Sequence, residues 1–328
     1  MRRLGLALCV LTALAAPAWA ETCPGHPDAI GTSRTIAVDP AALPQIGRMQ
    51  YQTSLPLDDH EVVLTFDDGP LPPYTARILD ILAANCVKVD YFLVGSMATT
   101  YPGLVRRIYN AGHVIGTHSL DHPLSFNRMD EAGIAQQVDE GIAAVDAAVG
   151  DPRAVAPFFR IPGLLRSSRA DAVLGSKSLA VWSADEVADD WRHGITPKQI
   201  VSRALRRIEA KGHRGVLLLH DIHPATVAAL PMLLRELKER GYRIVQAVPT
   251  GERPASVPDL PQRTVASAEP RVTGTVTSRE NSAKRAVHQH AHKPHRHAHH
   301  HRRHGGKVKL AKRRHSHTAD MGWFPVWR

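Results

Sequence analysis

Residues 61–70, Glu61-Val62-Val63-Leu64-Thr65-Phe66-Asp67-Asp68-Gly69-Pro70, join an apolar run to two adjacent carboxylates and a turn. The run predicts a buried strand over 61–66, and Gly69-Pro70 predicts a turn directly after it. Because side chains alternate in direction along a strand, Asp67 and Asp68 can face one place only where the chain turns. Two such acids could share the work of metal-assisted hydrolysis, one holding the metal and one acting as a base, although a plain polar turn would have the same sequence.

A second polar segment, His118-Ser119-Leu120-Asp121-His122, follows the apolar run 113–117. Two histidines four residues apart lie on the same side of a helical turn. With one carboxylate from elsewhere they form a set of three metal ligands that leaves positions for water and substrate. Taken alone, the pair is a weak signal, because two such histidines are more often satisfied polar or surface residues than metal ligands.

Three further polar segments stand where an apolar run ends. They are Arg160-Ile161-Pro162-Gly163, Asp189-Asp190-Trp191 and His220-Asp221. The apolar runs predict seven strands, near 61–66, 89–94, 113–117, 155–161, 178–183, 215–220 and 242–247. Helical patterns lie between them, for example 130–149, where apolar residues recur at three- and four-residue steps. A (β/α) barrel places its catalytic residues at the carboxyl ends of several strands, so the pattern predicts an α/β fold of this kind.

The five segments, in this order, resemble the motifs of the polysaccharide deacetylase family, which is carbohydrate esterase family 4 and contains the NodB-homology domain. The matching motifs are TFDDGP at 65–70, HSxxH at 118–122, RxP at 160–162, the Asp-Trp pair at 190–191 and LxLHD at 217–221. Single motifs could arise by chance, but five in order are specific. The resemblance implies a single irregular barrel of about seven parallel strands.

The resemblance also implies a role for each motif residue. Asp67 would be the catalytic base, oriented by Arg160, and His220 would be the general acid, supported by Asp190. The remaining assignments are metal ligation by Asp68, His118 and His122, oxyanion binding by the amide of Gly163, and substrate contacts by Trp191 and Leu218.

The implied metal is a divalent cation held by two imidazoles and one carboxylate. Zinc is the simplest choice, with cobalt, nickel and manganese as alternatives. Such an ion keeps a positive charge that polarises a carbonyl group and can lower the pKa of bound water from about 15.7 to about 7. Protonation of the departing amine by a histidine matters because an amine is a poor leaving group.

The sequence departs from the family pattern at two places. Gly163 stands where many members have an aromatic residue, so an amide donor is kept but a wall of the sugar site is lost. The fourth motif offers three aspartates, Asp185, Asp189 and Asp190, and we place the motif on Asp190-Trp191. Trp191 fits a core aromatic residue and a sugar-stacking residue equally well.

The amino terminus predicts export. Met1-Arg2-Arg3, the apolar stretch 4–16 and Ala18-Trp19-Ala20 have the pattern of a signal peptide over residues 1–20. No later stretch approaches the roughly 20 apolar residues of a membrane-spanning helix. Once Cys9 is removed with the signal, Cys23 and Cys86 are left, and an even pair in an oxidising compartment predicts a disulfide.

The remaining segments flank the catalytic domain, which we place at 60–249. Residues 21–59 show no sustained period and predict a loop-rich lead-in. Residues 250–328 have a low-complexity, His- and Arg-rich composition that predicts disorder. Residues 284–328 contain 5 Lys, 7 Arg and 1 Asp, a formal charge of +11, whereas the whole chain carries +10, so the basic character belongs to the tail.

Two classes of function fit these observations. The first is an N-deacetylase acting on chitooligosaccharide, peptidoglycan or exopolysaccharide, periplasmic or extracellular, with an O-acetyl esterase of the xylan type as its variant. The second is a non-catalytic envelope- or glycan-binding protein whose basic tail adheres to anionic cell-envelope polymers. Export argues against nucleic acid as the partner of the tail, and a binding protein would not need both an acid and a base.

Overall fold

The computed structural model describes residues 23–258 of the chain. Its sheet contains ten strands, and every pairing within it is parallel. The strands are β1 (Thr32–Val38), β2 (Gln45–Ile46), β3 (Glu61–Asp67), β4 (Asp90–Leu93), β5 (Val114–Thr117), β6 (Val155–Arg160), β7 (Ala180–Trp182), β8 (Glu186–Val187), β9 (Gly215–His220) and β10 (Arg243–Pro249). The seven predicted strands are all present, and the parallel α/β architecture is confirmed.

The barrel is an incomplete ring. Starting from β8, the neighbours in the sheet are β9, β3, β4, β5, β6 and β7, and no pairing joins β7 to β8 within residues 23–258. These two short strands follow each other directly in the chain, so the covalent backbone bridges the gap where the hydrogen-bonded ladder stops. The prediction of an irregular barrel is therefore confirmed.

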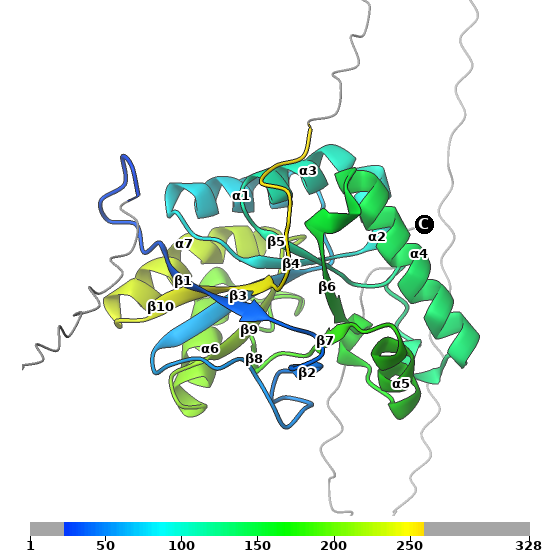
Figure 1. The fold of residues 1–328 in the computed structure, drawn as a ribbon. Coiled ribbons are helices and arrows are strands. Elements are labelled where there is room, and N and C mark those ends of the chain that lie inside the picture. The colour runs from blue at the N-terminus through cyan, green and yellow to red at the C-terminus, as the bar shows by residue number, and fades with distance from the viewer. Residues whose placement is uncertain (1–22, 259–328) are drawn as a thin grey trace, which may run out of the picture. The chain divides into compact units, whose positions relative to one another are not determined.

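The helices surround the strands (Figure 1). They are α1 (Tyr74–Ala84), α2 (Gly95–Thr100), α3 (Pro102–Asn110), α4 (Glu131–Val149), α5 (Ser168–Ser176), α6 (Pro197–Ala210) and α7 (Pro224–Glu239), with 3-10 turns at Phe126–Arg128, Pro152–Ala154 and Pro162–Leu164. The ends of α4 agree with the periodic pattern, because the side chain of Asp130 caps its first turn and Gly150, at φ 88°, ends it in the left-handed conformation.

Two apolar clusters hold this arrangement together. Outward-facing residues of β3, such as Leu64 and Phe66, pack against α1 and α7. Inward-facing residues, such as Val63, Phe92 and Trp182, fill the barrel. The period-two alternation along β3 thus separates the two clusters, and it directs Thr65 and Asp67 to the same side as Val63.

The segment before β3 is more than the loop-rich lead-in that we expected. It contributes β1, which pairs with β10, and β2, which pairs with β7. Ile36 and Val38 of β1 join the interior cluster together with Val245 and Ala247 of β10. The apolar residues of β1 are few and alternate with exposed ones. This segment therefore forms a strand only because its partner strand is present.

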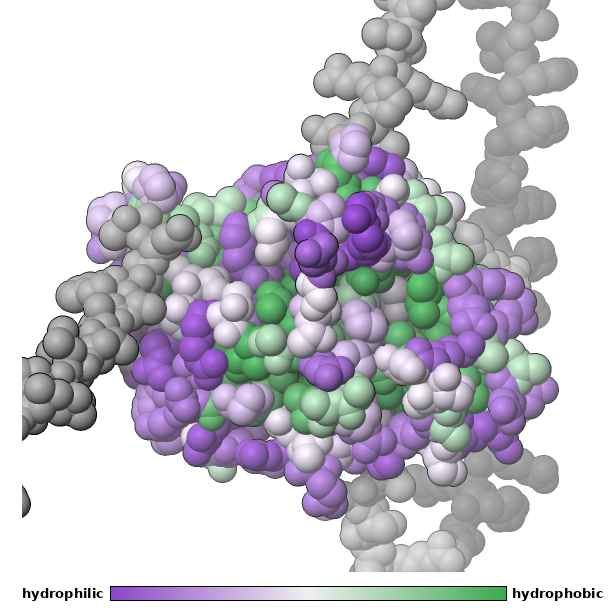
Figure 2. Space-filling model, viewed as in Figure 1, coloured by the Kyte–Doolittle hydropathy of each residue, from purple (hydrophilic) through white to green (hydrophobic). Residues whose placement is uncertain are grey.

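Strand β10 lies at the amino ends of β3, β4 and β5. The side-chain amide of Gln246 donates to the carbonyl oxygens of Val89 at 3.3 Å and Gly112 at 3.0 Å, and these residues stand just before β4 and β5. Figure 2 shows hydrophobic residues between hydrophilic ones on the face of the molecule where β1 and β10 lie. These hydrogen bonds tie β10 to the amino ends of β4 and β5.

The ordered domain extends beyond the predicted boundary at residue 249. Asn110 of α3 exchanges two hydrogen bonds with the backbone of Val257, and the side chain of Val257 is buried in the outer apolar cluster. The reason the sequence did not reveal this is that a single apolar residue anchors an otherwise polar stretch. The rest of the predicted tail, from residue 259, and the predicted signal peptide lie outside the described residues.

A disulfide bond joins Cys23 to Cys86, whose Cα atoms are 5.6 Å apart. Cys86 follows the end of α1, so the bond ties the first described residue to that helix. Across residues 23–258, no helix has both the length and the apolar composition needed to cross a membrane.

Candidate active site

The residues singled out in the sequence meet at the carboxyl edge of the barrel. Asp67, Arg160 and His220 are the last residues of β3, β6 and β9. Asp67 pairs in register with His220 across the β3–β9 ladder. His118 comes directly after β5, whose neighbours are β4 and β6. Residues far apart in the chain are thus assembled by strand order alone.

The turn after β3 lets two adjacent aspartates face the site together. Asp68 has φ 77°, in the left-handed region, so its side chain does not continue the alternation of the strand. Gly69 is required at the next position, because a Cβ there would lie 2.1 Å from Oδ2 of Asp221. The turn that the sequence predicted is therefore packed tightly against the end of β9.

Asp68, His118 and His122 form a set of three potential metal ligands. Their ligand atoms lie within 4.8 Å of one another. Oδ1 of Asp68 is 3.5 Å from Nε2 of His118 and 3.3 Å from Nε2 of His122. This oxygen is buried and receives no hydrogen bond from any residue in the described part of the chain. An unsatisfied carboxylate oxygen facing two imidazole nitrogens fits a divalent cation.

The imidazole of His118 is held in the tautomer that a metal ligand needs. Its Nδ1 lies 2.7 Å from the carbonyl oxygen of Arg160, and since a carbonyl only accepts, Nδ1 carries the proton. Nε2 is then free of a proton and directed at Asp68. Burial, helped by the neighbouring His122, lowers the pKa of His118 to about 3, so the ring is neutral at ordinary pH.

The carboxylate of Asp68 is kept ionised. Burial alone would raise its pKa, but the nearby histidines lower it below its usual range, and His122 has the largest effect among them. A negative oxygen on Asp68 and a neutral imidazole on His118 are protonation states that bind a cation.

Asp67 is held by a fully buried arginine. Nη1 of Arg160 donates to Oδ1 of Asp67 at 2.5 Å and to Oγ1 of Thr65 at 2.8 Å, while Nη2 donates to the carbonyl oxygen of Ser183 at 2.9 Å. The guanidinium also lies over the ring of Phe92, 4.1 Å from its centroid. Burial raises the pKa of Asp67 to about 6, although the charges of Arg160 and His220 oppose this rise. A carboxylate with a pKa near neutrality is suited to accept a proton.

His220 is fixed by Asp190. Its Nδ1 donates to Oδ1 of Asp190 at 2.8 Å, and its backbone N–H donates to Oδ2 of the same carboxylate at 2.7 Å. Thr226 adds a hydrogen bond of 2.6 Å to Oδ2. Burial alone would lower the pKa of His220, but Asp190, with smaller contributions from Asp68 and Asp67, raises it to about 9. The ring is therefore an imidazolium at neutral pH.

The three aspartates of the fourth motif have separate partners, which the sequence could not distinguish. Asp185 accepts hydrogen bonds from the backbone of Arg48 and Val216 and from the hydroxyl of Ser54. Asp189 is paired with Arg192, Arg203 and Arg207. Only Asp190 contacts His220.

The predicted substrate residues lie beside this centre. Trp191 places its ring edge-on to His220, with centroids 5.3 Å apart. Leu218 is buried in a small apolar cluster with Ala184 and Val187, against which Trp191 and Leu164 pack. Gly163 adopts φ 58° in the turn after β6.

Sequence reasoning missed two residues that support the site. Oδ2 of Asp221 accepts a hydrogen bond of 2.6 Å from Oγ1 of Thr75, which in turn accepts one of 2.7 Å from the backbone N–H of Leu71. The two residues brace the turn that carries Asp68. Burial raises the pKa of Asp221 to about 7. The only sequence signal was that Asp221 ends the LxLHD motif, and nothing marked Thr75.

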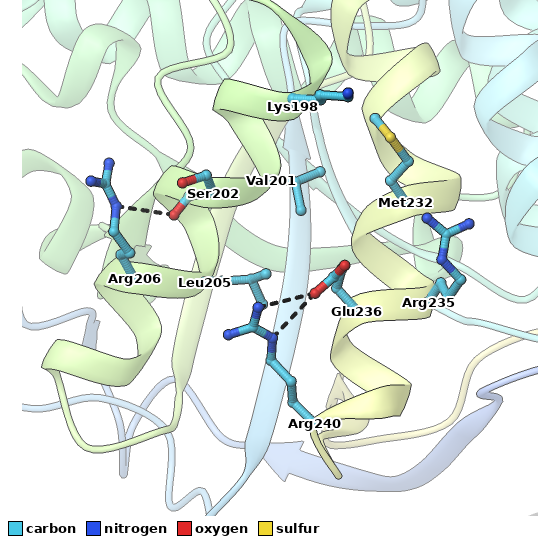
Figure 3. Close-up of a pocket in the computed structure, with 9 residues that line it drawn as sticks. All are labelled: Lys198, Val201, Ser202, Leu205, Arg206, Met232, Arg235, Glu236 and Arg240. Carbon is cyan, nitrogen blue, oxygen red and sulfur yellow. Dashed lines mark hydrogen bonds and ion pairs between the residues drawn. The ribbon is translucent and has the colours of Figure 1, made fainter.

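A groove of about 350 Å³ lies elsewhere, between α6 and α7 (Figure 3). Val201, Leu205 and Met232 form its apolar floor, and Arg240 is paired with Glu236 at its edge. None of the predicted site residues lines it. The residues predicted to carry the chemistry therefore lie at the carboxyl edge and not in this groove.

Comparison with known proteins agrees with this geometry. A family model described as polysaccharide deacetylase matches residues 55–182. A peptidoglycan-N-acetylglucosamine deacetylase of Bacillus cereus is 34% identical over 185 residues, which are 55% of this chain and 66% of that protein. A chitooligosaccharide deacetylase of Sinorhizobium fredii is 32% identical over 204 residues, which are 57% of this chain and 90% of that protein.

Solved structures give the same result. A peptidoglycan deacetylase of Bdellovibrio bacteriovorus is 32% identical and has a TM-score of 0.60, over 68% of this chain and 61% of that one. The chain thus spans slightly less than two thirds of this protein and of the Bacillus cereus relative, and most of the Sinorhizobium fredii relative.

Proposed function

Because the chain belongs to the polysaccharide deacetylase family, carbohydrate esterase family 4, we propose that it hydrolyses N-acetyl groups of a glycan with the help of a divalent metal. The observation that carries this proposal is the juxtaposition of Asp68, His118 and His122 with a buried base, Asp67, and an imidazolium, His220. A protein that only bound a glycan would have no use for a paired acid and base.

The metal would be held by Asp68, His118 and His122, and zinc fits two imidazoles and one carboxylate best, with cobalt, nickel and manganese as alternatives. When bound, such an ion supplies Lewis-acid chemistry, acidifying water and polarising the acetamide carbonyl. The carbonyl of Arg160, acting on Nδ1 of His118, keeps this ligand oriented.

In the proposed reaction, water adds to the acetamide carbon and the carbon–nitrogen bond breaks, giving acetate and an amine. Asp67 accepts the proton of the attacking water, and Arg160 holds the carboxylate in place for this step. His220 then donates its proton to the departing nitrogen. Asp190 keeps that histidine charged and turned toward the site. The amide of Gly163 is proposed as a donor to the developing oxyanion.

The raised pKa of His220 favours N-deacetylation over O-deacetylation. An amine leaves only when its nitrogen is protonated, whereas an alkoxide from an O-acetyl ester needs this assistance less. A histidine that stays protonated up to pH of about 9 suits the more demanding leaving group. Trp191 and Leu218 are proposed to contact the substrate beside this acid.

For the substrate we propose an N-acetylglucosamine-containing polymer. The relatives are named for peptidoglycan and for chitooligosaccharides, and both polymers carry the same acetamide group. Such substrates would be met outside the cytoplasm, which agrees with the signal peptide expected over residues 1–20. The basic tail is proposed to hold the enzyme on anionic envelope polymers.

The decisive test is acetate release by the purified mature protein from peptidoglycan, chitin oligomers and O-acetylated xylan, with and without a chelator. We expect release from an N-acetylated glycan that is lost on metal removal and restored by adding zinc. His118→Ala should lose both metal and activity, since it removes one of three protein ligands. Full activity of a verified metal-free sample would overturn the mechanism, and release from xylan alone would favour the esterase.

A further inference from the structure

Positive charge is concentrated on one helix of a domain that is otherwise slightly acidic. Residues 23–258 contain 24 Arg and Lys against 26 Asp and Glu, a formal net charge of −2. Residues 192–214, which include α6, contain seven Arg and Lys and one acidic residue, Glu209, a formal charge of +6. This uneven distribution gives one face of the domain a positive field.

Helix α6 has apolar and basic side chains on different sides. Its buried residues are Ile200, Val201, Ala204, Leu205 and Ile208. Its exposed or partly exposed cations are Lys198, Arg203, Arg206 and Arg207. An amphipathic helix with four or more cations is typical of segments that bind anionic membrane surfaces. An ordinary surface helix can have the same division, so the groove beside α6 is the more informative feature.

The groove between α6 and α7 has cations without strong partners. Within residues 23–258, Lys198 makes no hydrogen bond or ion pair. Arg235 is paired with Glu239 of its own helix at 3.9 Å, and both side chains are 61% exposed. Arg240, by contrast, is held by Glu236 at 3.0 Å. Lys198 lies at one end of the groove and the pair of Arg240 with Glu236 at the other (Figure 3), so the first end is open to an anion.

The floor between these charges is apolar. Val201 and Leu205 of α6 are buried beneath it, and Met232 of α7 is partly exposed. The space measures about 350 Å³. This volume is at the lower end of small-molecule sites and is too small for a further helix, which is about 10 Å wide. The groove therefore fits a small anionic group with an apolar part.

The charge of the groove narrows the choice of its occupant. Residues 284–328 of the chain carry a formal charge of +11, so this segment would be repelled. A second copy of the chain would bring the same positive groove to a symmetric contact. An anionic polymer would use the cations alone, whereas an anionic phospholipid also presents its glycerol and acyl groups to the apolar floor.

We propose that this groove binds the headgroup of an anionic phospholipid and docks α6 on a membrane surface. The lipid phosphate pairs with Lys198 and Arg235, and the glycerol region lies against Met232. Arg206, exposed on α6, adds attraction to neighbouring headgroups. The inference goes beyond the proposed function, because it concerns where the domain is held and leaves the chemistry of the carboxyl edge unchanged.

The test measures binding of the full-length chain to phosphatidylcholine vesicles that contain phosphatidylglycerol. We expect Lys198→Gln/Arg235→Gln to weaken this binding by about thirtyfold, because two cations are lost from contact with an anionic surface. Arg128→Gln/Arg169→Gln is the matched control, since it removes the same charge from two exposed positions near α5. The control should bind nearly as well as the wild type.

A local probe distinguishes the groove from the rest of the chain. Because Cys23 and Cys86 are joined, Ser202→Cys gives the mature chain one free thiol, at the edge of the groove. An environment-sensitive dye on this thiol should shift its emission to shorter wavelength when phosphatidylglycerol vesicles are added. The same dye on Ser168→Cys, at the start of α5, should not respond.

Three results would overturn the lipid site. They are equal losses of vesicle binding in the groove variant and the control, unchanged emission of the dye at position 202, and an equal loss of affinity for soluble dextran sulfate. The last result would assign the groove to an anionic polymer. Acetate release from soluble chitin oligomers should be the same in the groove variant and the wild type, so a failure of the proposed function would be seen separately.

Discussion

The carboxylate of Asp190 accepts two hydrogen bonds from His220. Its Oδ1 accepts from the ring Nδ1, and its Oδ2 accepts from the backbone N–H. The ring is thereby fixed relative to its own backbone, and its other nitrogen, Nε2, lies 3.9 Å from Oδ2 of Asp68. The orientation of the proposed acid, and the largest contribution to keeping it charged, thus come from one buried side chain.

The pH profile of kcat/KM is expected to be bell-shaped. Asp67 must be ionised to accept a proton, and burial raises its pKa to about 6, so activity should fall below that pH. His220 must be protonated, and its pKa is raised to about 9, so activity should fall above that pH. Initial rates at low substrate concentration between pH 5 and 10 would check both limbs. A profile that rises steadily through pH 10 would contradict the role of His220.

Asp190→Asn should move the alkaline limb to lower pH. The variant removes the charge of Asp190, which raises the pKa of His220 against the effect of burial. The midpoint of the alkaline limb should therefore shift to lower pH by about 1 pH unit or more. The acidic limb, set by Asp67, should move less. Asp189→Asn is a matched control, because that carboxylate pairs with arginines and does not touch His220. An alkaline limb at the wild-type position would assign the acid elsewhere.

Asp67→Asn and Asp68→Asn should separate base from ligand. Asp67→Asn is expected to retain metal while turnover falls by about 10²- to 10⁴-fold, because the base is lost and the ligands are kept. Asp68→Asn should lose its metal, and activity as a consequence, since Oδ1 of Asp68 faces both histidines. Metal content per chain and kcat are the two measurements. Because Asp67→Asn leaves the buried Arg160 without its ion-pair partner, circular dichroism should accompany them. Metal loss in the Asp67 variant would exchange the two roles.

Thr75→Val should weaken metal binding from a distance. The hydroxyl of Thr75 links the carboxylate of Asp221 to the backbone of Leu71, so its removal frees the turn that carries Asp68. We expect zinc affinity to fall by about tenfold, as for other residues that support a ligand. Thr75→Ser keeps the hydroxyl and should restore binding. Leu230→Ala, in the outer apolar cluster, should destabilise the fold without this loss, which makes it the control in a zinc titration.

Removal of the tail should leave catalysis on short oligomers intact. The truncated chain should end after Pro258 and not at residue 249, because Val257 is packed against α3. The truncated chain should bind insoluble, anionic envelope material more weakly than the full-length chain. This difference between the two chains should vanish near 1 M salt, where the screening length is only about 3 Å. Co-sedimentation at low and high salt measures this. Equal binding at low salt would make the tail inert, and a salt-insensitive difference would indicate specific contacts.

The sequence predicted the parts of this protein that have long, continuous signals. Seven strands and the five motifs stood out because each strand is a buried apolar run with polar residues at its end. Strands β1, β2 and β8 were not predicted. The apolar residues of β1 are confined to 36–38, and β2 and β8 have only two residues each, so these segments gain order from a partner strand. The choice of Asp190 over Asp185 and Asp189 likewise depends on three-dimensional partners that local sequence does not encode.

Arg160 reaches two functional groups through different ends of one residue. Its guanidinium holds the carboxylate of Asp67, while its carbonyl oxygen orients the ring of His118. The proposed base and the proposed metal site are therefore both positioned by one residue, Arg160, at the carboxyl end of β6. A shift of this strand would displace both together, so engineers who transplant the site into another barrel would have to fit β6 first and could not tune the two halves separately.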